Sequence, residues 1–357
     1  MTKVYVGMSG GVDSSLTAAL LVEQGYDVTG VYMKNWTEDL PGMKCPWADD
    51  LADAKRVAVQ LGIDFKVFDF ENEYKHKVVD YMIEEYKLGR TPNPDIMCNQ
   101  EVKFKLFLEA ALEDGADMIA TGHYARVEGE TTPLSGEHRL GTLKMASDTN
   151  KDQTYFLYRV TGEALAKTLF PLGSFTKPEV REMARARGLF TAGKKDSQGI
   201  CFVGKIGIRE FLSQYVEQKP GNIVDKKTGK TIGHHDGAIF YTLGQRHGLN
   251  LGGGLPYYVV GKDMDKNEVY VTTDLNDDTL WKADVELAAV HWINEAPKSG
   301  AYHIRVRHRA PLVKAQLTFE GDGVKLHLDN PERAVAAGQS VVIYDGDTCL
   351  GGGIVAA

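Results

Sequence analysis

The chain has 357 residues, of which 43% are hydrophobic and 25% charged, and its formal net charge is −8. This length exceeds one typical hydrophobic core, so two or three domains are expected. The negative charge excludes nucleic-acid binding through the overall field, and any such contact must come from local basic patches. No apolar run reaches the length of a membrane span and the start lacks a signal-peptide pattern, so we expect a cytoplasmic protein without a membrane partner.

The cysteines limit the chemistry further. The chain has four, widely separated along the sequence: Cys45, Cys98, Cys201 and Cys349. Their spacing matches neither a disulfide framework nor paired C-x-x-C zinc ligands. In a reducing compartment, each cysteine is therefore expected to serve packing or chemistry.

A glycine turn follows the first apolar run at residues 4–6. The turn, Ser-Gly-Gly-Val-Asp-Ser at residues 9–14, leads into a helical stretch. Such a turn aims unpaired N–H groups and the positive end of the helix dipole at one spot, which predicts an anion site. The turn lacks the lysine of a Walker A loop and the spacing of a dinucleotide fold. It resembles the PP-loop of ATP pyrophosphatases, which grip the β,γ-pyrophosphate and transfer AMP; a glycine turn that binds nothing is the alternative.

Strands and helices alternate through the first part of the chain. The patterns predict strands at 26–33, 65–69 and 117–121, and helices at 47–61, 71–86 and 100–112. This alternation is typical of an α/β fold with a doubly wound parallel sheet. Ligands of such sheets bind beyond the carboxyl ends of the strands, where the glycine turn would lie.

Residues 89–99 interrupt the alternation. Pro92 and Pro94 argue against a helix there, and Asn99 is the expected N-cap of the helix at 100–112. Cys98 would then lie at a helix N-terminus, which lowers the pKa of a thiol and favours the thiolate. Asp95 is placed to act as a base or to orient a substrate N–H. A structural loop cysteine is the alternative.

Two further segments have polar residues in notable places. Gly122-His123-Tyr124 ends the strand at 117–121 on the expected nucleotide side, where His123 is either a turn residue or a functional one. The helix that begins after Thr176 carries Lys177, Arg181 and Arg185 at intervals of four residues. These residues would form one basic stripe, for which a solvated helix face is the alternative.

After about residue 207 the alternation ends, and short strands with glycine turns follow. Residues 257–260 and 268–271 form a predicted hairpin, and the segment from about 283 is again all strands, as in a small barrel. We therefore expect a PP-loop catalytic domain at 1–206, a small mixed or β central domain at 207–282 and a C-terminal β-barrel at 283–357.

Residues 303–309 predict a strand with a basic face. Alternation would place His303, Arg305, Arg307 and Arg309 on one side, with Ile304 and Val306 in the barrel core. Three neighbouring guanidiniums predict a phosphate-binding track. Pairing with carboxylates such as Glu320 or Asp322 is the alternative.

Several motifs occur together and in order. They are the PP-loop, Asn93-Pro94-Asp95-x-x-Cys98-Asn99, Gly122-His123-Tyr124, Lys151-Asp152-Gln153 and Asp196-Ser197-Gln198-Gly199-Ile200-Cys201. With them the whole chain resembles the tRNA-specific 2-thiouridylases (MnmA/TrmU family). The resemblance implies conversion of the wobble uridine of tRNA to 2-thiouridine, with ATP as a substrate accompanied by Mg²⁺ and no tightly bound cofactor or dedicated metal site. The implied partners are tRNA with an unmodified wobble uridine and a persulfide-bearing sulfur donor, either a cysteine desulfurase or a relay protein.

The resemblance also implies roles for individual residues. Cys98 would be the nucleophile and Cys201 the persulfide carrier, with Asp95 in the same catalytic group. The implied ATP-binding residues are Gly7, Met8, Ser9, Gly10, Gly11, Val12, Asp13, Ser14, Met33 and Gly122. The implied contacts with the target base or tRNA are Asn93, Pro94, Asp95, His123, Lys151, Asp152, Gln153, Arg307, His308 and Gln339.

Two other functions fit parts of the pattern. An AMP-forming synthetase or amidotransferase could use the same loop but needs no pair of cysteines. A non-catalytic nucleotide- or RNA-binding module would leave Asp95, Cys98 and Cys201 without a purpose. Dependence of pyrophosphate release on unmodified tRNA discriminates between these functions.

Overall fold

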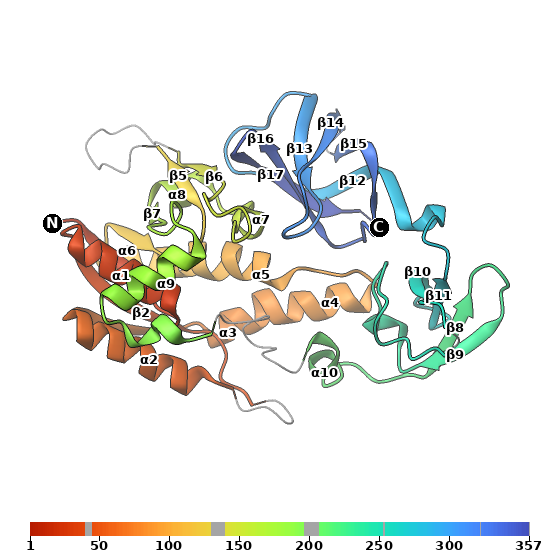
Figure 1. The fold of residues 1–357 in the computed structure, drawn as a ribbon, viewed down its shortest axis with the longest axis horizontal. Coiled ribbons are helices and arrows are strands. Elements are labelled where there is room, and N and C mark those ends of the chain that lie inside the picture. Colours follow the sequence, from red (N-terminus) through yellow and green to blue (C-terminus); the bar gives the residue numbers. More distant parts are fainter. Residues whose placement is uncertain (40–44, 130–139, 196–206, 253, 322, 357) are drawn as a thin grey trace.

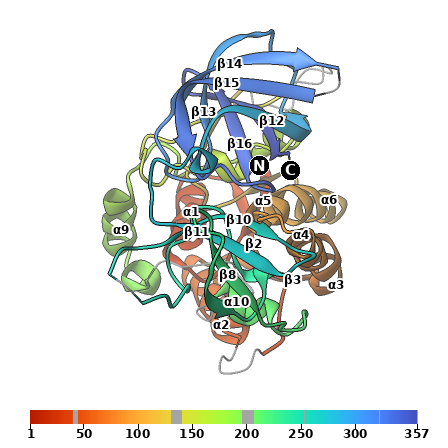
Figure 2. The ribbon, with the colours of Figure 1, turned by 90° about the vertical axis from the view of Figure 1, so that its right-hand side faces the viewer.

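The computed structural model describes residues 1–39, 45–129, 140–195, 207–252, 254–321 and 323–356. Within them lie a parallel sheet near the N-terminus, a small mixed sheet and a C-terminal barrel (Figure 1). The arrangement confirms the predicted fold class. The barrel lies above the helical layer, and the mixed sheet lies at one end of the molecule (Figures 1 and 2).

The N-terminal sheet has the order β3-β2-β1-β4-β7, and all its pairings are parallel. Its strands are β1 (Lys3–Gly7), β2 (Asp27–Lys34), β3 (Asp64–Asp69), β4 (Met118–Ala120) and β7 (Thr168–Leu169). The chain builds outward from β1 through β2 to β3 and then returns to place β4 on the other side of β1. Loops after β1 and β4 therefore flank the point where the strand order reverses, which is where open α/β sheets bind ligands.

Helices cover both faces of this sheet, as Figure 2 shows. On the face of Val4 and Val6, the core includes residues of α1 (Val12–Glu23) and α2 (Trp47–Leu61). On the face of Tyr5 and Ile119, it includes two longer helical runs. The first, residues 71–87, comprises α3 (Glu71–Tyr74), the π-helical η1 (Lys75–Asp80) and α4 (Tyr81–Lys87). The second, which we call the 94–113 helix, comprises α5 (Pro94–Met97), the π-helical η2 (Cys98–Leu106) and α6 (Phe107–Glu113).

The 94–113 helix begins earlier than the sequence pattern predicts. Its N-cap is Asn93, whose Oδ1 accepts hydrogen bonds from the backbone N–H groups of Asp95 (3.1 Å) and Ile96 (3.4 Å). The expected start near Asn99 is wrong because proline is well tolerated at the first helical position, where its missing N–H would have no partner. Cys98 is thus the fifth residue of the helical run, beyond the first turn in which a helix dipole acts.

The remaining helices of the N-terminal region are shorter. They are α7 (Thr154–Leu157), α8 (Gly162–Ala166), α9 (Lys177–Ala186), the 3₁₀ turn η3 (Phe190–Gly193) and α10 (Ile208–Leu212). A capping box starts α9, in which Thr176 and Glu179 satisfy each other's backbone N–H groups.

The small mixed sheet has the order β10-β11-β8-β9. Its strands are β8 (Gly221–Asp225), β9 (Thr231–His235), β10 (Tyr258–Asp263) and β11 (Glu268–Thr272), accompanied by the 3₁₀ turns η4 (Ala238–Phe240) and η5 (Asp278–Leu280). The predicted hairpin at 257–271 is confirmed, because β10 and β11 pair antiparallel. A separate apolar cluster that includes Ile223, Val259 and Val269 forms its core.

The barrel is antiparallel and closed. Its strands are β12 (Trp281–Trp292), β13 (Gly300–Arg305), β14 (Val313–Glu320), β15 (Gly323–Arg333), β16 (Ser340–Asp345) and β17 (Thr348–Val355). They follow the order β12-β15-β14-β13-β16-β17, and pairing of β12 with β17 closes the ring. A hairpin of the N-terminal region, β5 (Arg126–Glu128) and β6 (Thr142–Lys144), extends this sheet because β6 pairs with β17.

The predicted basic face at residues 303–309 does not form. β13 ends at Arg305, whose side chain is buried, and Arg309 lies in a turn with a positive φ of 62°. Arg305 lies on the face of β13 opposite the barrel core that holds Ile304. The N-terminal region covers that face, and the Arg305 guanidinium pairs there with the buried Asp152 carboxylate. Arg307 is exposed, but it is not part of a continuous row of arginines on one strand face.

Candidate active site

The PP-loop conformation depends on close backbone contacts. Gly10 has a φ of 71°, and a Cβ there would lie 2.5 Å from the carbonyl oxygen of Asp50. Gly122, directly after β4, lies against the loop so closely that a Cβ would be 2.9 Å from both the Asp13 carbonyl carbon and the Ser14 nitrogen. Glycine is therefore required at both places, and the loops after β1 and β4 form one surface.

Asp13 in this loop is paired with a lysine that lies far away in the sequence. The Nζ of Lys177 is 2.7 Å from both carboxylate oxygens of Asp13, and the hydroxyl of Tyr124 donates to Oδ1 at 2.9 Å. Lys177 is buried, and the Arg181 guanidinium donates to the carbonyl oxygens of Ala192 and Lys194. Neither the basic stripe nor its alternative, a solvated helix face, describes α9, because Lys177 and Arg181 bond to groups around the PP-loop and η3.

A second lysine approaches the loop from the other side. The Nζ of Lys194 donates to the Gly10 carbonyl oxygen (3.1 Å) and pairs with Asp50 and Asp53 of α2, both at 2.8 Å. These contacts fix the loop to α2. The glycine turn is therefore held by α1, α2 and the segment around α9 and η3 together.

The 94–113 helix connects this loop to a second feature. A Cβ on Gly7 would lie 3.0 Å from Met33 Cε and 3.5 Å from the Phe107 ring, so the C-terminal part of the helix touches the base of the PP-loop. Cys98 lies nine residues before Phe107 and five after Asn93. It therefore lies along the helical run between the residue that contacts Gly7 and the N-cap.

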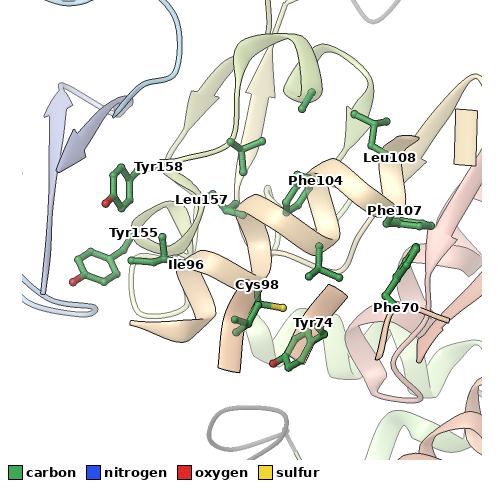
Figure 3. Packing of buried hydrophobic residues seen from close by; sticks show 14 of the residues in the cluster. Phe70, Tyr74, Ile96, Cys98, Phe104, Phe107, Leu108, Tyr155, Leu157 and Tyr158 are labelled. Carbon is green, nitrogen blue, oxygen red and sulfur yellow. The ribbon is translucent and has the colours of Figure 1, made fainter. Parts of the chain in front are cut away.

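Cys98 itself is buried among apolar side chains, with 3% of its surface exposed. Figure 3 shows it between Ile96 and Tyr74, on the packed side of the helix. It opens the π-helical segment η2, a type of irregularity that is frequent at functional sites. Cys45 and Cys349 are likewise buried and free, and burial raises the pKa of both thiols. Cys201 lies outside the described residues.

A pocket of about 320 Å³ opens at the N-terminal end of the 94–113 helix. The N-terminal region contributes Pro92, Asn93, Asp95, Tyr155 and Phe156, and the barrel contributes Arg307, His308 and Gln339. We call this the interdomain pocket. It brings together five residues that the resemblance assigns to the target base or tRNA, from three distant parts of the chain. Its size falls within the range of small-ligand sites.

The pKa values of two titratable groups in this pocket are both shifted in the direction that favours the uncharged form. Burial raises the pKa of the Asp95 carboxyl, which the charge of Lys103 partly opposes. Burial, with help from Arg309 and Arg305, lowers the pKa of His308 to about 4. The His308 ring packs on Phe156 with centroids 4.4 Å apart, and its buried Nδ1 has no hydrogen-bond partner among the residues that the structure describes. His308 therefore joins Tyr155 and Phe156 in lining the pocket.

Other residues that the resemblance assigns to tRNA lie apart from this pocket. His123 packs between Phe104 and Phe170 with its Nδ1 2.8 Å from Thr121 Oγ1, and burial lowers its pKa well below the ordinary value. Gln153 accepts a hydrogen bond from the Tyr124 backbone N–H. The Lys151 backbone N–H donates to Asp148, and the Asp152 carboxylate is fully buried. Pro94 is buried at the first position of the 94–113 helix.

Sequence reasoning did not assign a function to Tyr155, Phe156, Lys177 or Lys194. The two aromatic residues stand in an apolar helix that is indistinguishable from a core helix in the pattern. The lysines belong to a polar helix and its exit, where no local signal points to the PP-loop. Only the closeness of Tyr155 to the Lys151-Asp152-Gln153 motif offers a hint in the sequence.

Family models match nearly the whole chain. They are the tRNA methyl transferase HUP domain at residues 2–205, the tRNA methyl transferase PRC-barrel domain at 209–273 and the aminomethyltransferase beta-barrel domain at 283–355. The chain is 47% identical over 360 residues to the tRNA-specific 2-thiouridylase MnmA of Streptococcus sanguinis, covering 99% of this chain and 95% of that one. The chain belongs to the tRNA-specific 2-thiouridylase family.

Two more members of the family are almost as similar. The MnmA proteins of Geobacillus thermodenitrificans and Enterococcus faecalis are each 46% identical, over 99% of this chain and 94% and 95% of theirs. Such coverage includes the PP-loop, the 94–113 helix and the barrel. In the part of the chain that the structure describes, no helix is long and apolar enough to cross a membrane.

Proposed function

We propose that the protein is an ATP-dependent tRNA-uridine 2-sulfurtransferase that forms 2-thiouridine at the wobble position. The observation that carries this proposal is the 94–113 helix. Its Phe107 lies against Gly7, at the end of β1 just before the PP-loop, and its start lines the interdomain pocket at Asn93 and Asp95. Its cysteine, Cys98, lies between those two ends. One rigid element therefore relates an anion loop, a thiol and a base-sized pocket.

The PP-loop supports the first step, activation of the base. The C2 oxygen of uracil is a poor leaving group, so it must first be adenylated. It attacks the α-phosphorus of ATP, and pyrophosphate leaves. Backbone N–H groups at the start of α1 and the hydroxyls of Ser9 and Ser14 are suited to stabilise that leaving group. Mg²⁺ would arrive with ATP as part of the substrate.

Sulfur then enters as a nucleophile. The terminal sulfur of a persulfide on Cys201 attacks the adenylated C2, and AMP leaves as the Cys98 thiolate takes the inner sulfur to form a Cys98–Cys201 disulfide. If Cys98 instead attacks the persulfide first, sulfide leaves and attacks C2. Both routes require an external thiol to reduce the disulfide afterwards.

The interdomain pocket is suited to hold the flipped base. Phe156 and Tyr155 offer aromatic surfaces for stacking, and Asn93, Asp95 and His308 offer polar atoms to the base edge. Arg307 at the rim is suited to a phosphate. A persulfide-bearing protein would supply the sulfur, and a cytoplasmic location follows from the same proposal because free thiols must stay reduced.

The test is incubation with ATP, Mg²⁺, a persulfide source and tRNA that lacks the modification, followed by nucleoside analysis. We expect 2-thiouridine together with AMP and pyrophosphate, and we expect pyrophosphate release to require the tRNA. Formation of ADP and phosphate would contradict the PP-loop assignment. Pyrophosphate release without any tRNA would favour a synthetase acting on a small molecule.

A further inference from the structure

The interdomain pocket depends on how the barrel is seated on the N-terminal region. At this contact Asp152 and Arg305 form an ion pair, with 2.7 Å between Arg305 Nη1 and Asp152 Oδ2 and side-chain exposures of 6% and 0%. Asp152 lies between β6 and α7, and Arg305 is the last residue of β13. The pair therefore joins the two parts whose residues line the pocket.

The Asp152 carboxylate has no exposed surface and accepts three hydrogen bonds from protein groups. Its Oδ1 accepts from the Ala146 backbone N–H (3.0 Å), and its Oδ2 accepts from the Thr154 hydroxyl (2.8 Å) as well as from Arg305. Thr154 Oγ1 is also 3.2 Å from the hydroxyl of Tyr344 on β16. Asp152 thus contacts protein on every side, and no tRNA group can reach it in this arrangement.

A second set of bonds crosses the same contact beside the pair. The Tyr155 hydroxyl donates to the Ser340 carbonyl oxygen at 2.9 Å, and the Tyr158 hydroxyl is 3.1 Å from Ser340 Oγ. Figure 3 shows both hydroxyls directed away from the 94–113 helix toward the barrel strands. We call these groups, Asp152, Thr154, Tyr158, Arg305, Ser340 and Tyr344, the interface network.

The interface network and the pocket lining alternate along the chain. Tyr155 lines the pocket and follows Thr154 directly. Arg307 lines it two residues after Arg305, and Gln339 lines it directly before Ser340. Tyr155, Arg307 and Gln339 are therefore each attached, within two residues, to a group that is fixed across the contact.

We propose that Asp152 and Arg305 are positioning residues for the thiolation reaction: their buried ion pair sets the separation of the two walls of the interdomain pocket. This inference rests on the proposed function. It reassigns Asp152 from tRNA contact to a role through Tyr155 and Phe156, and it assigns Arg305 a role through Arg307 and His308. A buried pair suits this purpose because charged groups that leave each other in a low dielectric are penalised, so one geometry is selected.

The decisive variant is the double substitution Asp152→Asn with Arg305→Gln, which removes both charges and leaves no buried charge unpaired. We expect a folded protein in which the KM for tRNA rises and kcat for thiolation falls at least tenfold, with unchanged affinity for ATP. The matched control is Asp347→Asn, which breaks the exposed pairs with Arg126 and Lys144 at the same contact. We expect that control to keep both kinetic constants.

A milder variant tests the same proposal in case the double variant does not fold. Tyr158→Phe removes only the bond to Ser340 Oγ, and we expect a two- to fivefold rise in the KM for tRNA with a wild-type KM for ATP. Wild-type kinetic constants in Tyr158→Phe or in a folded double variant would overturn the proposal. Absence of 2-thiouridine in the wild-type reaction run alongside would instead overturn the proposed function, and tRNA-binding affinities of the same variants would still test the positioning role.

Discussion

The PP-loop and the interdomain pocket are held in place by different means. The loop is a contiguous stretch of backbone, fixed by glycine contacts and by Lys177 and Lys194 of the same N-terminal region. The pocket is made of side chains from two regions, and its shape depends on contacts such as Tyr155 to Ser340 that cross between them. The loop should therefore tolerate a displaced barrel, whereas the pocket should not. We therefore expect substitutions at the loop to weaken ATP binding without weakening tRNA binding, and substitutions at the pocket to do the reverse.

The largest effect is expected for a variant that stops the sulfur transfer but leaves ATP and tRNA binding intact. Cys98→Ser should lower thiolation at least ~1,000-fold, because a hydroxyl cannot take sulfur from a persulfide. Nucleoside analysis measures the loss, and affinities for ATP and tRNA should remain unchanged. Cys349→Ser, at another buried free thiol, is the control and should retain thiolation. Thiolation by the Cys98 variant at the wild-type rate would refute the proposed chemistry.

The next variant disturbs the loop alone. Gly122→Ala places a Cβ 2.9 Å from backbone atoms of Asp13 and Ser14, so the PP-loop must shift. A misplacement of this kind costs about 100-fold in rate, which tRNA-dependent pyrophosphate release would report, while tRNA affinity should stay near wild type. Gly252→Ala, where a Cβ meets nothing within 4 Å, is the control. Equal losses of ATP and tRNA affinity would show that the two sites are not independent.

A smaller effect is expected at the rim of the pocket. Arg307→Ala should weaken tRNA binding roughly tenfold and lower the slope of log K against log salt by about 1, because one phosphate contact is lost. Titration of tRNA at several salt concentrations measures both quantities. Arg56→Ala, at an exposed arginine of α2, should leave the slope unchanged. A normal slope with a lowered melting temperature would make Arg307 structural.

The smallest effect concerns the pH dependence of stability. The pKa of His308 is lowered to about 4 in the folded protein against an ordinary value of 6.5, so between these values the unfolded chain binds the proton more readily. The contribution of His308 is thus complete above about pH 6.5 and is lost as the pH falls toward 4. Denaturant titrations of His308→Gln should show a flatter decline than wild type over this range. An identical decline would contradict burial of the neutral ring, and the exposed His234 offers the control substitution to Gln.

Local signals predicted much of the fold and the PP-loop. The strands at 26–33 and 65–69, the helix at 47–61 and the hairpin at 257–271 follow from short-range periodicity, and the PP-loop is a contiguous motif. The start of the 94–113 helix was mispredicted because Pro94 suits its first position while also signalling a break. Arg305 was expected to be exposed because alternation cannot reveal that this face is covered, nor that its partner Asp152 comes from 153 residues earlier.

Local patterns also could not reveal how the rest of the candidate site is assembled. Residues 93–95, 307–308 and 339 were assigned through the family resemblance, but their meeting in one pocket depends on tertiary contacts that leave no local pattern. Lys177 illustrates this most clearly. Its spacing with Arg181 and Arg185 is typical of a solvated face, whereas its ammonium group lies against Asp13.

The pairing of β6 with β17 has a consequence for synthesis of the chain. Lys144 of β6 contacts Asp347 across 203 residues, so β17 is translated long after β6. At ribosomal rates of about 5–20 residues per second, the edge of the β5–β6 hairpin waits roughly 10–40 s for its partner. An unpaired edge is a template for association with other chains. Nascent or truncated chains that lack β17 should therefore be the aggregation-prone forms of this protein, and Arg126 and Lys144 place positive charge on the hairpin during that interval.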